Sequence, residues 1–458
     1  MDQLTALDAG FLEVEDSDPH VSLAVGGVSI VEGPAPTYQE FFESFAERIA
    51  TIPRCTQVLR THPLDLRPPN WVDDPHFDLA RHLHRIALPH PGGDAELFEL
   101  IASLMERRLD RERPLWECWI IEGLSGNRWA VLTKIHHCIA DGIATTQLLS
   151  KFSDDADGDT FAADVGAARK PTGSGSAKVS LNPLSWVSGL GRSAFGAVSA
   201  AEHAAIGAAE LAAGLLHPAP DSSLRGPVTA MRRYSAARAR LTDMHKVART
   251  FGVTLNDVAL AAITHSYRGV MLARGEQPGR DSLRTLVPVS VRAVDHFNVA
   301  GNRVSAMLPL LPVDEEDPVR QLKLVHDRLS HAKASGQSEG GSAMVVAAKR
   351  TPFVLSAWAI RLLSRIPQRA VVALATNVPG PRSRQRLMGR RVLELWPIPP
   401  IALQVRTGVA MLSYADTFVF GITADYDTAP DIDALAAGIE DGMAQLIAAA
   451  RKRRRKSS

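Results

Sequence analysis

Hydrophobic positions in the first 150 residues follow two spacings. The valine-rich segment 21–31 and the short apolar runs 116–122 and 129–135 are typical of strands. A Ser-Gly-Asn turn at 125–127 separates the last two runs, which predicts a β-hairpin or two neighbouring buried strands. Residues 41–52 and 97–109 carry apolar side chains at helical spacing, and the first of these segments stops before Pro53. Strands and helices therefore alternate in this part of the chain.

The same alternation returns after residue 227. Helical patterns cover 235–250, 254–269, 319–334 and 432–450, whereas 283–291, 304–311 and 418–424 have the pattern of strands. Mixed elements in both halves predict an α/β or α+β fold with two sheet-containing lobes.

A compositional change separates the two halves. Residues 154–178 are rich in Asp, Gly, Ser and Ala, as in a flexible connector, and 184–216 are alanine- and glycine-rich, as in a helical crossover. We therefore divide the chain into a first lobe (1–153), a linker and crossover segment (154–226), a second lobe (227–450) and a basic tail (451–458).

Charge and composition exclude several classes of protein. The 458 residues contain 51 Lys and Arg against 50 Asp and Glu, so the formal net charge is +1 and no global attraction to nucleic acid is expected. Three scattered cysteines are too few for a disulfide framework, and no apolar run is long enough to cross a membrane. We expect a cytoplasmic protein. The basic run 451–456 and the apolar segment 351–365 hint at a membrane surface, although a solvated tail and an amphipathic core helix are the simpler interpretation.

The sharpest chemical signal is the segment KIHHCIADG at 134–142. It follows a predicted strand and precedes the apolar-periodic segment 143–149. Successive side chains of a strand point to opposite faces, so His136 and His137 cannot both enter one pocket. At most one is a general base, and we expect the other to be packed or hydrogen-bonded.

Other features of this segment have structural explanations. Asp141 lies where the next helix would begin and could cap it, and Gly142 permits a tight turn. Zinc is the rival to a catalytic histidine, but adjacent histidines on a strand diverge and no further cluster has ligand spacing. We therefore expect no metal.

At this point the sequence resembles a known superfamily. HHxxxDG after a strand is the signature of the CoA-dependent acyltransferases, which include chloramphenicol acetyltransferase and peptide-synthetase condensation domains. Within it, the chain resembles the bacterial wax ester synthase/acyl-CoA:diacylglycerol acyltransferase family, most of all its triacylglycerol-forming members. The further segments that carry this resemblance, in family order along the chain, are LTALDAGFL (4–12), RPLWE (113–117), NDVALA (256–261), GNRV (301–304) and ATNVPGP (375–381).

The resemblance implies a fold and a reaction. It implies two chloramphenicol-acetyltransferase-like lobes with a tunnel between them, reached by acyl-CoA from one side and by the alcohol from the other. His137 would be the general base in a direct transfer to diacylglycerol or a long-chain alcohol, with acyl-CoA as co-substrate and no resident cofactor. Asp141 would hold its loop by a salt bridge. Membranes or lipid droplets would be the places where the protein meets its acceptor.

The remaining motif residues have two interpretations each. Asn256 and Asp257 either cap a helix or place Asn256 at the tunnel, where it would position the acyl carbonyl or support His137. The segment Pro114, Leu115 and Trp116 is better explained by packing beside the active strand than by chemistry. For the last two motif residues we expect that Asn377, with Pro379, Gly380 and Pro381, fixes a turn near the lobe interface and that Arg303 is a buried pairing partner.

Two patterns and one cysteine compete with this interpretation. The GLGRSA segment at 189–194 matches a loose dinucleotide-binding pattern but follows no strand, and the GQSEG segment at 336–340 matches GxSxG but follows a helical segment. Cys138 adjoins His137 but tends to face away from the pocket. A carrier-dependent condensation enzyme and a non-catalytic lipid-binding protein remain as alternatives to the lipid acyltransferase.

Overall fold

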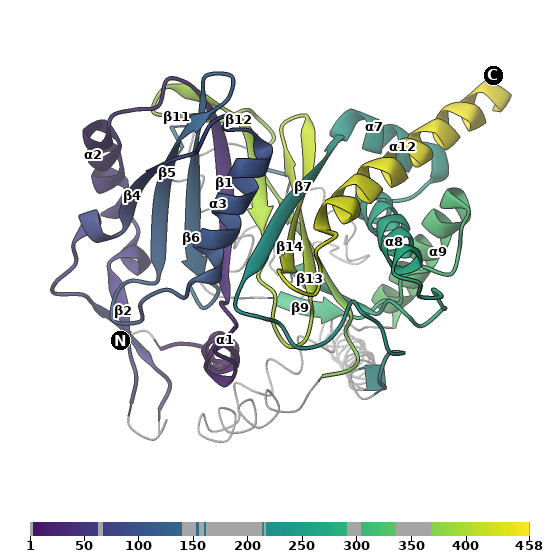
Figure 1. The fold of residues 1–458 in the computed structure, drawn as a ribbon, viewed down its shortest axis with the longest axis horizontal. Coiled ribbons are helices and arrows are strands. Elements are labelled where there is room, and N and C mark those ends of the chain that lie inside the picture. The colour runs from purple at the N-terminus through teal and green to yellow at the C-terminus, as the bar shows by residue number, and fades with distance from the viewer. Residues whose placement is uncertain are drawn as a thin grey trace, which may run out of the picture.

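The computed structural model describes residues 3–62, 67–139, 153–154, 160–161, 213–214, 217–290, 304–335 and 368–457. Within these ranges most of the strands form two six-stranded sheets that lie side by side, each carrying its own helices (Figure 1). Residues 155–159 and 162–178 of the expected linker lie outside the described residues, as does most of the crossover segment.

The first sheet has the order β11-β12-β1-β6-β5-β4. Its own lobe contributes the elements α1 (Ala6–Ser17), β1 (Ala24–Glu32), α2 (Tyr38–Ile49), β4 (Leu83–Ala87), α3 (Asp94–Glu106), β5 (Trp116–Leu124) and β6 (Arg128–His136). A small separate ribbon consists of β2 (Gln57–Arg60) and β3 (Asn70–Asp73). The predicted hairpin is confirmed, because β5 and β6 pair antiparallel with Trp116 opposite Ile135.

Local signals explain why the predicted helices of this lobe form. Helix α2 begins at a capping box in which the side chain of Thr37 accepts from the backbone of Glu40 and the carboxylate of Glu40 accepts from the backbone of Thr37. Its apolar face, Phe41, Phe45 and Ile49, is buried in the hydrophobic core of the first lobe. Both helices predicted in this part of the chain are therefore confirmed, with shifted ends.

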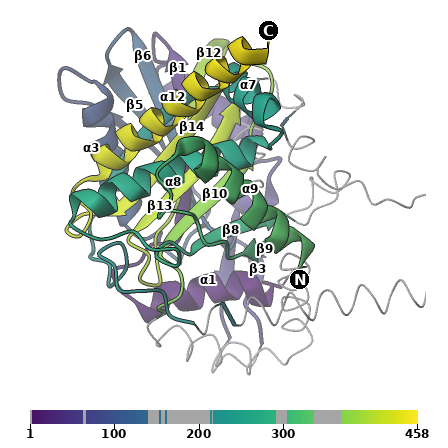
Figure 2. The same ribbon diagram turned by 90° about the vertical axis from the view of Figure 1, so that its right-hand side faces the viewer.

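The second sheet has the order β7-β14-β13-β10-β8-β9. Its helices cover the face that is turned to the viewer in Figure 2. The elements of this half are β7 (Arg232–Arg240), α7 (Leu241–Phe251), α8 (Leu255–Ala273), β8 (Thr285–Ser290), β9 (Val304–Met307), α9 (Pro318–Ala334), β10 (Ala373–Pro379), β13 (Thr407–Tyr414), β14 (Thr417–Asp425) and α12 (Ile432–Ser457).

Two expectations about this half are wrong. Residues 235–250 are not one helix, because 235–240 belong to β7, which pairs antiparallel with β14, and the helix starts only at Leu241. The basic tail does not follow a helix that ends at residue 450. Helix α12 continues through the basic run to Ser457 and projects from the body of the protein (Figure 1).

Two strands of the first sheet come from the second half of the sequence. They are β11 (Arg386–Leu387) and β12 (Arg390–Ile398), and β12 pairs antiparallel with β1, placing Val28 opposite Trp396. The expectation that 227–450 forms the second lobe alone is therefore wrong for these two strands.

Strand β12 also connects the two sheets. A Cβ atom added to Gly421 of β14 would lie 1.7 Å from the carbonyl oxygen of Pro397, so β14 and β12 approach each other closely at this glycine. Tyr234 of β7 donates a hydrogen bond of 3.0 Å to the same carbonyl. Arg238, also on β7, pairs with Asp94 and Glu394 at 2.8 Å each. The two sheets are thus joined by backbone, aromatic and charged contacts.

Candidate active site

The adjacent histidines lie where β6 leaves the middle of the first sheet. His136 is the last residue of β6, and its backbone N–H donates to Leu115 O at 3.0 Å. The N–H of His137 donates to Leu23 O at 3.0 Å, and the N–H of Ile139 then turns back to His136 O at 2.9 Å. The backbone of two other segments, at Leu23 and Leu115, therefore fixes the point at which the chain turns.

His136 is the buried member of the pair, with 1% of its side chain exposed. Its Nδ1 accepts a hydrogen bond of 3.2 Å from the backbone N–H of Cys138. Because a backbone N–H only donates, Nδ1 must present a lone pair, so the proton of the neutral imidazole is on Nε2. Nε2 lies 3.4 Å from Oε2 of Glu15. The expectation that one histidine of the pair is packed and hydrogen-bonded is confirmed.

His137 is the partly exposed member. Its ring stacks on that of Phe11, with ring centroids 4.1 Å apart and an interplanar angle of 22°. The histidine that the sequence predicts as the general base is thus the one with an accessible side chain, and an aromatic ring holds one of its faces.

The buried carboxylate of Glu15 lies next to the ring of His136. Glu15 is 2% exposed, and its two oxygens accept from Leu23 N at 3.0 Å and from Arg111 at 2.8 Å. Burial alone would raise the pKa of Glu15, but interactions with His136, Arg111 and the Leu23 amide lower it from 4.5 to about 2. Glu15 is therefore ionised at neutral pH, next to the protonated nitrogen of His136.

A buried lysine lies two residues before the pair on the same strand. Burial lowers the pKa of Lys134 to about 8, although nearby carboxylates oppose that effect. Its Nζ donates to the carbonyl oxygens of Leu104 and Arg107 at the end of α3. These bonds satisfy carbonyls that the last turn of a helix leaves free, so Lys134 has a structural role.

Cys138 is buried, and its surroundings make its thiol unreactive. Only 2% of it is exposed, and desolvation raises the pKa of its thiol well above the ordinary value. A thiol with a raised pKa is a poor nucleophile, because the thiolate is the reactive form. The expectation that Cys138 is structural agrees with this environment.

The motif at Pro114, Leu115 and Trp116 is packed beside the histidines. All three residues are buried, and Trp116 starts β5, next to β6. The indole N–H of Trp116 donates to Cys55 O at 2.9 Å, and its ring stacks on His82 at 4.7 Å. Leu115 supplies the carbonyl that anchors His136. Packing beside the active strand, rather than chemistry, is what these contacts provide.

The Asn-Asp motif begins a helix of the second lobe. The helix cap is Thr254, and Asp257 completes a capping box by accepting from Thr254 N at 2.8 Å. Asp257 also pairs with Nδ1 of His326 at 2.7 Å. The capping interpretation is therefore confirmed for Asp257, although the cap itself is the preceding threonine.

Asn256 has a partner in another motif. Nδ2 of Asn377 donates to Oδ1 of Asn256 at 3.2 Å, which joins the start of α8 to β10. Asn377 lies within β10, which ends at Pro379 just before Gly380 and Pro381, and its role in fixing the turn there stays a prediction. Asn256 at the tunnel stays a prediction.

Several predicted features lie outside the described residues. They include Asp141, Gly142, Arg303, the segment 143–149, the apolar segment 351–365 and the two competing patterns at 189–194 and 336–340.

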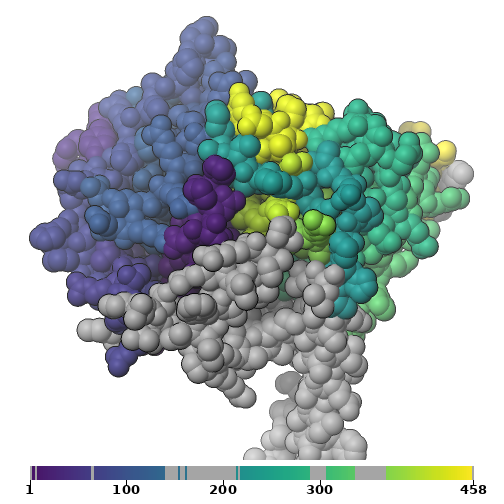
Figure 3. Space-filling view, turned by 60° about the horizontal axis from the view of Figure 1, so that its bottom comes forward, coloured from purple at the N-terminus to yellow at the C-terminus, as the bar shows by residue number. Residues whose placement is uncertain are grey.

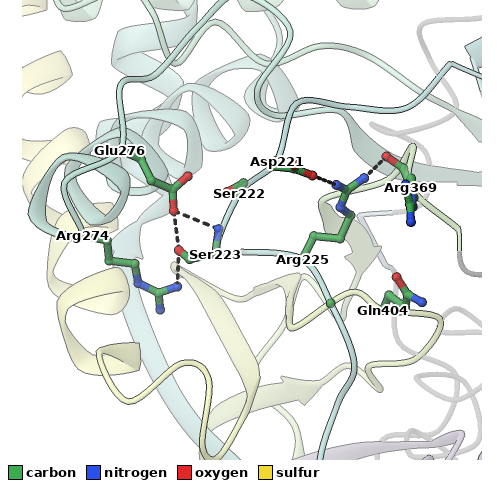
Figure 4. A pocket seen from close by; sticks show the side chains of 9 residues that line it. Asp221, Ser222, Ser223, Arg225, Arg274, Glu276, Arg369 and Gln404 are labelled. Carbon is green, nitrogen blue, oxygen red and sulfur yellow. Dashed lines mark hydrogen bonds and ion pairs between the residues drawn. The ribbon is translucent and has the colours of Figure 1, made fainter.

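An open pocket of about 670 Å³ lies in the second half of the chain, apart from the histidine pair (Figure 4). Several of its charged side chains have partners within or beside it: Arg225 pairs with Asp221 at 3.2 Å, Arg274 binds Asp431 and Ser223, and Ser223 N donates to Glu276 at 2.9 Å. The lining consists of Asp221, Ser222, Ser223, Arg225, Gly226, Arg274, Glu276, Arg369 and Gln404. In the described part of the chain no group of three His, Cys, Asp or Glu residues could hold a metal ion.

Comparison with known proteins shows the family of the chain that carries this site. The family model for the wax ester synthase/diacylglycerol acyltransferase catalytic domain matches residues 4–259, and the model for the C-terminal domain of the same family matches residues 300–447. The chain belongs to the wax ester synthase/diacylglycerol acyltransferase family. The resemblance seen in the sequence motifs is therefore confirmed over most of the chain.

Relatives of this acyltransferase match it from end to end. A Mycobacterium tuberculosis protein named diacylglycerol O-acyltransferase tgs1 is 54% identical over 99% of this chain and 97% of its own length. A second M. tuberculosis protein, also named a diacylglycerol O-acyltransferase, is 48% identical over 98% of this chain and 91% of its own length.

Solved structures of the same fold support the two-lobed architecture. The wax ester synthase/diacylglycerol acyltransferase from Marinobacter aquaeolei VT8 matches with a TM-score of 0.67 and 24% identity over 98% of this chain and 99% of its own. The starter condensation domain of rhizomide synthetase, solved in complex with C8-CoA, matches with a TM-score of 0.60 and 11% identity over 98% and 95%. At these identities the likeness concerns the fold, and it confirms the predicted fold class.

The sequence motifs did not indicate that helix α1 of the acyltransferase contacts the two histidines. Phe11 lies in the motif at 4–12, but the motif carries no chemistry that would indicate a partner. Glu15 lies outside every motif. A signal was present in their spacing, because residues four apart share one face of a helix. What that face contacts becomes visible only in the structure.

Proposed function

We propose that this protein transfers a fatty acyl group from acyl-CoA to the free hydroxyl of diacylglycerol and so forms triacylglycerol. The observation that carries the proposal is the 54% identity, along nearly the whole chain, to a protein named diacylglycerol O-acyltransferase. At such identity over both lobes, the two proteins share the fold and the residues around the histidine pair are expected to serve the same chemistry.

His137 is the general base of this reaction. It takes the proton of the acceptor hydroxyl while that oxygen attacks the thioester carbonyl, and the tetrahedral intermediate then collapses with cleavage of the carbon–sulfur bond. The CoA thiolate leaves and recovers the proton from the imidazolium. His136 is unsuited to this role because its ring is buried and its Nδ1 is engaged by Cys138 N.

The transfer is direct and needs no resident cofactor. A thioester is already an activated acyl group, so an imidazole near neutrality suffices. An acyl-enzyme on Cys138 is disfavoured because burial raises the pKa of that thiol. Acyl-CoA therefore enters as a co-substrate and leaves as free CoA.

The test uses purified protein with palmitoyl-CoA and either dioleoylglycerol or hexadecanol. Free CoA is followed with a thiol reagent, and the lipid product is identified by thin-layer chromatography. His137→Ala should lower turnover by about 10²–10⁴-fold, whereas Cys138→Ala, which removes only a buried thiol, should keep it within a few-fold.

Each outcome of this assay has a distinct meaning. Triacylglycerol that disappears in His137→Ala supports both the reaction and its base. A wax ester from hexadecanol alone keeps the mechanism and moves the acceptor to long-chain alcohols. Absence of CoA release with both acceptors contradicts the proposal and favours a non-catalytic lipid-binding protein or a condensation-type enzyme with another acceptor.

The place of action is also a proposal. None of the described helices is long and apolar enough to span a membrane. We propose that the protein works from the cytoplasm and meets diacylglycerol at an anionic membrane or lipid-droplet surface through the end of α12, whose basic residues 451–455 are exposed. Each such residue contributes up to about 1 kcal/mol near an anionic surface.

Co-sedimentation with vesicles tests this docking site. Deletion of residues 451–458 should abolish binding to phosphatidylglycerol vesicles at low salt and leave the weak binding to phosphatidylcholine vesicles unchanged. If the shortened protein still sediments with anionic vesicles, the end of α12 is not the docking site.

A further inference from the structure

One face of α1 contacts both histidines of the active site. Phe11 and Glu15 are four residues apart, so they lie one turn apart on the same side of the helix. The ring of Phe11 stacks on His137, and Oε2 of Glu15 lies 3.4 Å from Nε2 of His136. The helix therefore contacts the pair at two points, one for each ring.

Glu15 fixes the backbone on which His137 is mounted. Its Oε1 accepts from Leu23 N at 3.0 Å, and the carbonyl of the same leucine accepts from His137 N. Its Oε2 faces Nε2 of His136, whose other ring nitrogen holds Cys138 N. Leu23, which bonds to the backbone of His137, and His136, which precedes it in the sequence, thus both contact the carboxylate of Glu15.

Phe11 fixes the ring itself. A stacked aromatic ring at 4.1 Å covers one face of the imidazole and restricts its rotation about χ2, a torsion that is otherwise broad. Phe11 also packs against a cluster formed by Val21 and Leu23 of the first half and Val228 and Ile401 of the second. The N-terminal segment accordingly lies at the junction of the two lobes (Figure 3).

We propose that α1 is the positioning element of the acyl transfer site, in which Phe11 sets the plane of the His137 imidazole and Glu15, through His136, sets the turn that carries it. The inference rests on the proposed role of His137 as general base. A general base works only when its nitrogen lies in line with the proton that it removes, so a freely rotating ring would lower kcat without weakening substrate binding.

Kinetics of Phe11 variants separate positioning from simple packing. Phe11→Leu keeps the apolar volume but removes the flat ring, and we expect it to lower kcat by roughly tenfold or more with KM values within twofold of wild type. Phe11→Tyr keeps the ring and should retain most of kcat. If Phe11→Leu keeps wild-type kcat, Phe11 does not position the base.

Val14→Ala is the matched control. Val14 lies on the same helix and packs against the same cluster as Phe11, but it is not the residue that stacks on His137. Its truncation should lower the unfolding temperature without the drop in kcat. If Val14→Ala and Phe11→Leu lower kcat equally, packing of the helix explains the effect and the proposal fails.

A double-mutant cycle shows whether Phe11 acts through His137. In the His137→Ala background, Phe11→Leu should change the residual rate by less than twofold, because the ring that Phe11 orients is gone. An undiminished tenfold loss in that background would overturn the proposal. If instead His137→Ala alone keeps wild-type turnover, the proposed function with His137 as general base is contradicted. That result is distinct from one in which only the positioning role of Phe11 fails.

Glu15→Gln tests the second point of contact. In protein labelled with ¹⁵N-histidine, we expect the Nε2 resonance of His136 to shift in the variant, together with a fall in kcat, while the Cys138 amide keeps the ring in the Nε2-protonated form. An unchanged His136 spectrum with unchanged kcat would remove Glu15 from the positioning element.

Discussion

Glu15→Gln should lower the free energy of unfolding by about 3 kcal/mol near neutral pH. The carboxylate is 2% exposed, so water screens its interactions little. Although burial alone would raise the pKa of Glu15, its neighbours lower it from 4.5 to about 2. Each pKa unit corresponds to about 1.4 kcal/mol, and the lowering of about 2.5 units gives the figure above.

The same numbers fix the dependence on pH. Because the pKa in the folded state is below that of the unfolded chain, the stabilisation by Glu15 is fully present above pH 4.5 and is lost as the pH falls through about 2. At pH 3 about 1.4 kcal/mol of it remains. The difference in stability between wild type and variant should therefore narrow as the solution is acidified.

Urea unfolding followed by tryptophan fluorescence at pH 7, 5 and 3 measures this difference. Glu47→Gln, which changes an exposed glutamate of α2, is the control and should show no pH-dependent difference from wild type. A Glu15→Gln difference that stays constant from pH 7 to pH 3 would refute the electrostatic reasoning, as would a difference below about 1 kcal/mol at pH 7.

Two further predictions concern the contact between the lobes. Gly421→Ala places a methyl group 1.7 Å from Pro397 O, so we expect at least about 1–3 kcal/mol of destabilisation in a thermal scan. Gly269→Ala, whose added Cβ meets nothing within 4 Å, should be neutral or stabilising by up to about 1 kcal/mol. Arg238→Met removes the ion pairs with Asp94 and Glu394, and its cost of about 1 kcal/mol at low salt should shrink in 1 M NaCl. A cost independent of salt would contradict the ionic explanation.

The sequence alone predicts the elements that carry their own local signals. Residues 41–52 have helical spacing and a following proline, and the hairpin at 116–135 has a Ser-Gly-Asn turn. β7 lacks such a signal, because its Ala and Arg residues favour helix. It is a strand because Arg232, Tyr234 and Arg238 make contacts with the first lobe that only an extended backbone allows. Tertiary contacts override the local preference there.

The candidate site was predictable in part for a similar reason. Alternation along a strand indicates that one of His136 and His137 is buried, and the structure shows which. The partner of the buried histidine could not be deduced, because Glu15 lies on a helix more than a hundred residues earlier and no local pattern joins the two. The same holds for β12, whose pairing with β1 spans most of the chain.

The position of β12 in the first sheet has a consequence for folding during synthesis. While the chain is being synthesised, β1 can pair with β6 as soon as residue 136 has emerged, but its other edge has no partner until residues 390–398 leave the ribosome. An unpaired apolar strand edge invites pairing with other chains. This edge of the first lobe therefore stays open from the emergence of residue 136 until residue 398 is made, which is more than half of the synthesis of the 458-residue chain. Protection of that edge in the growing chain matters more here than in a protein whose halves fold one after the other.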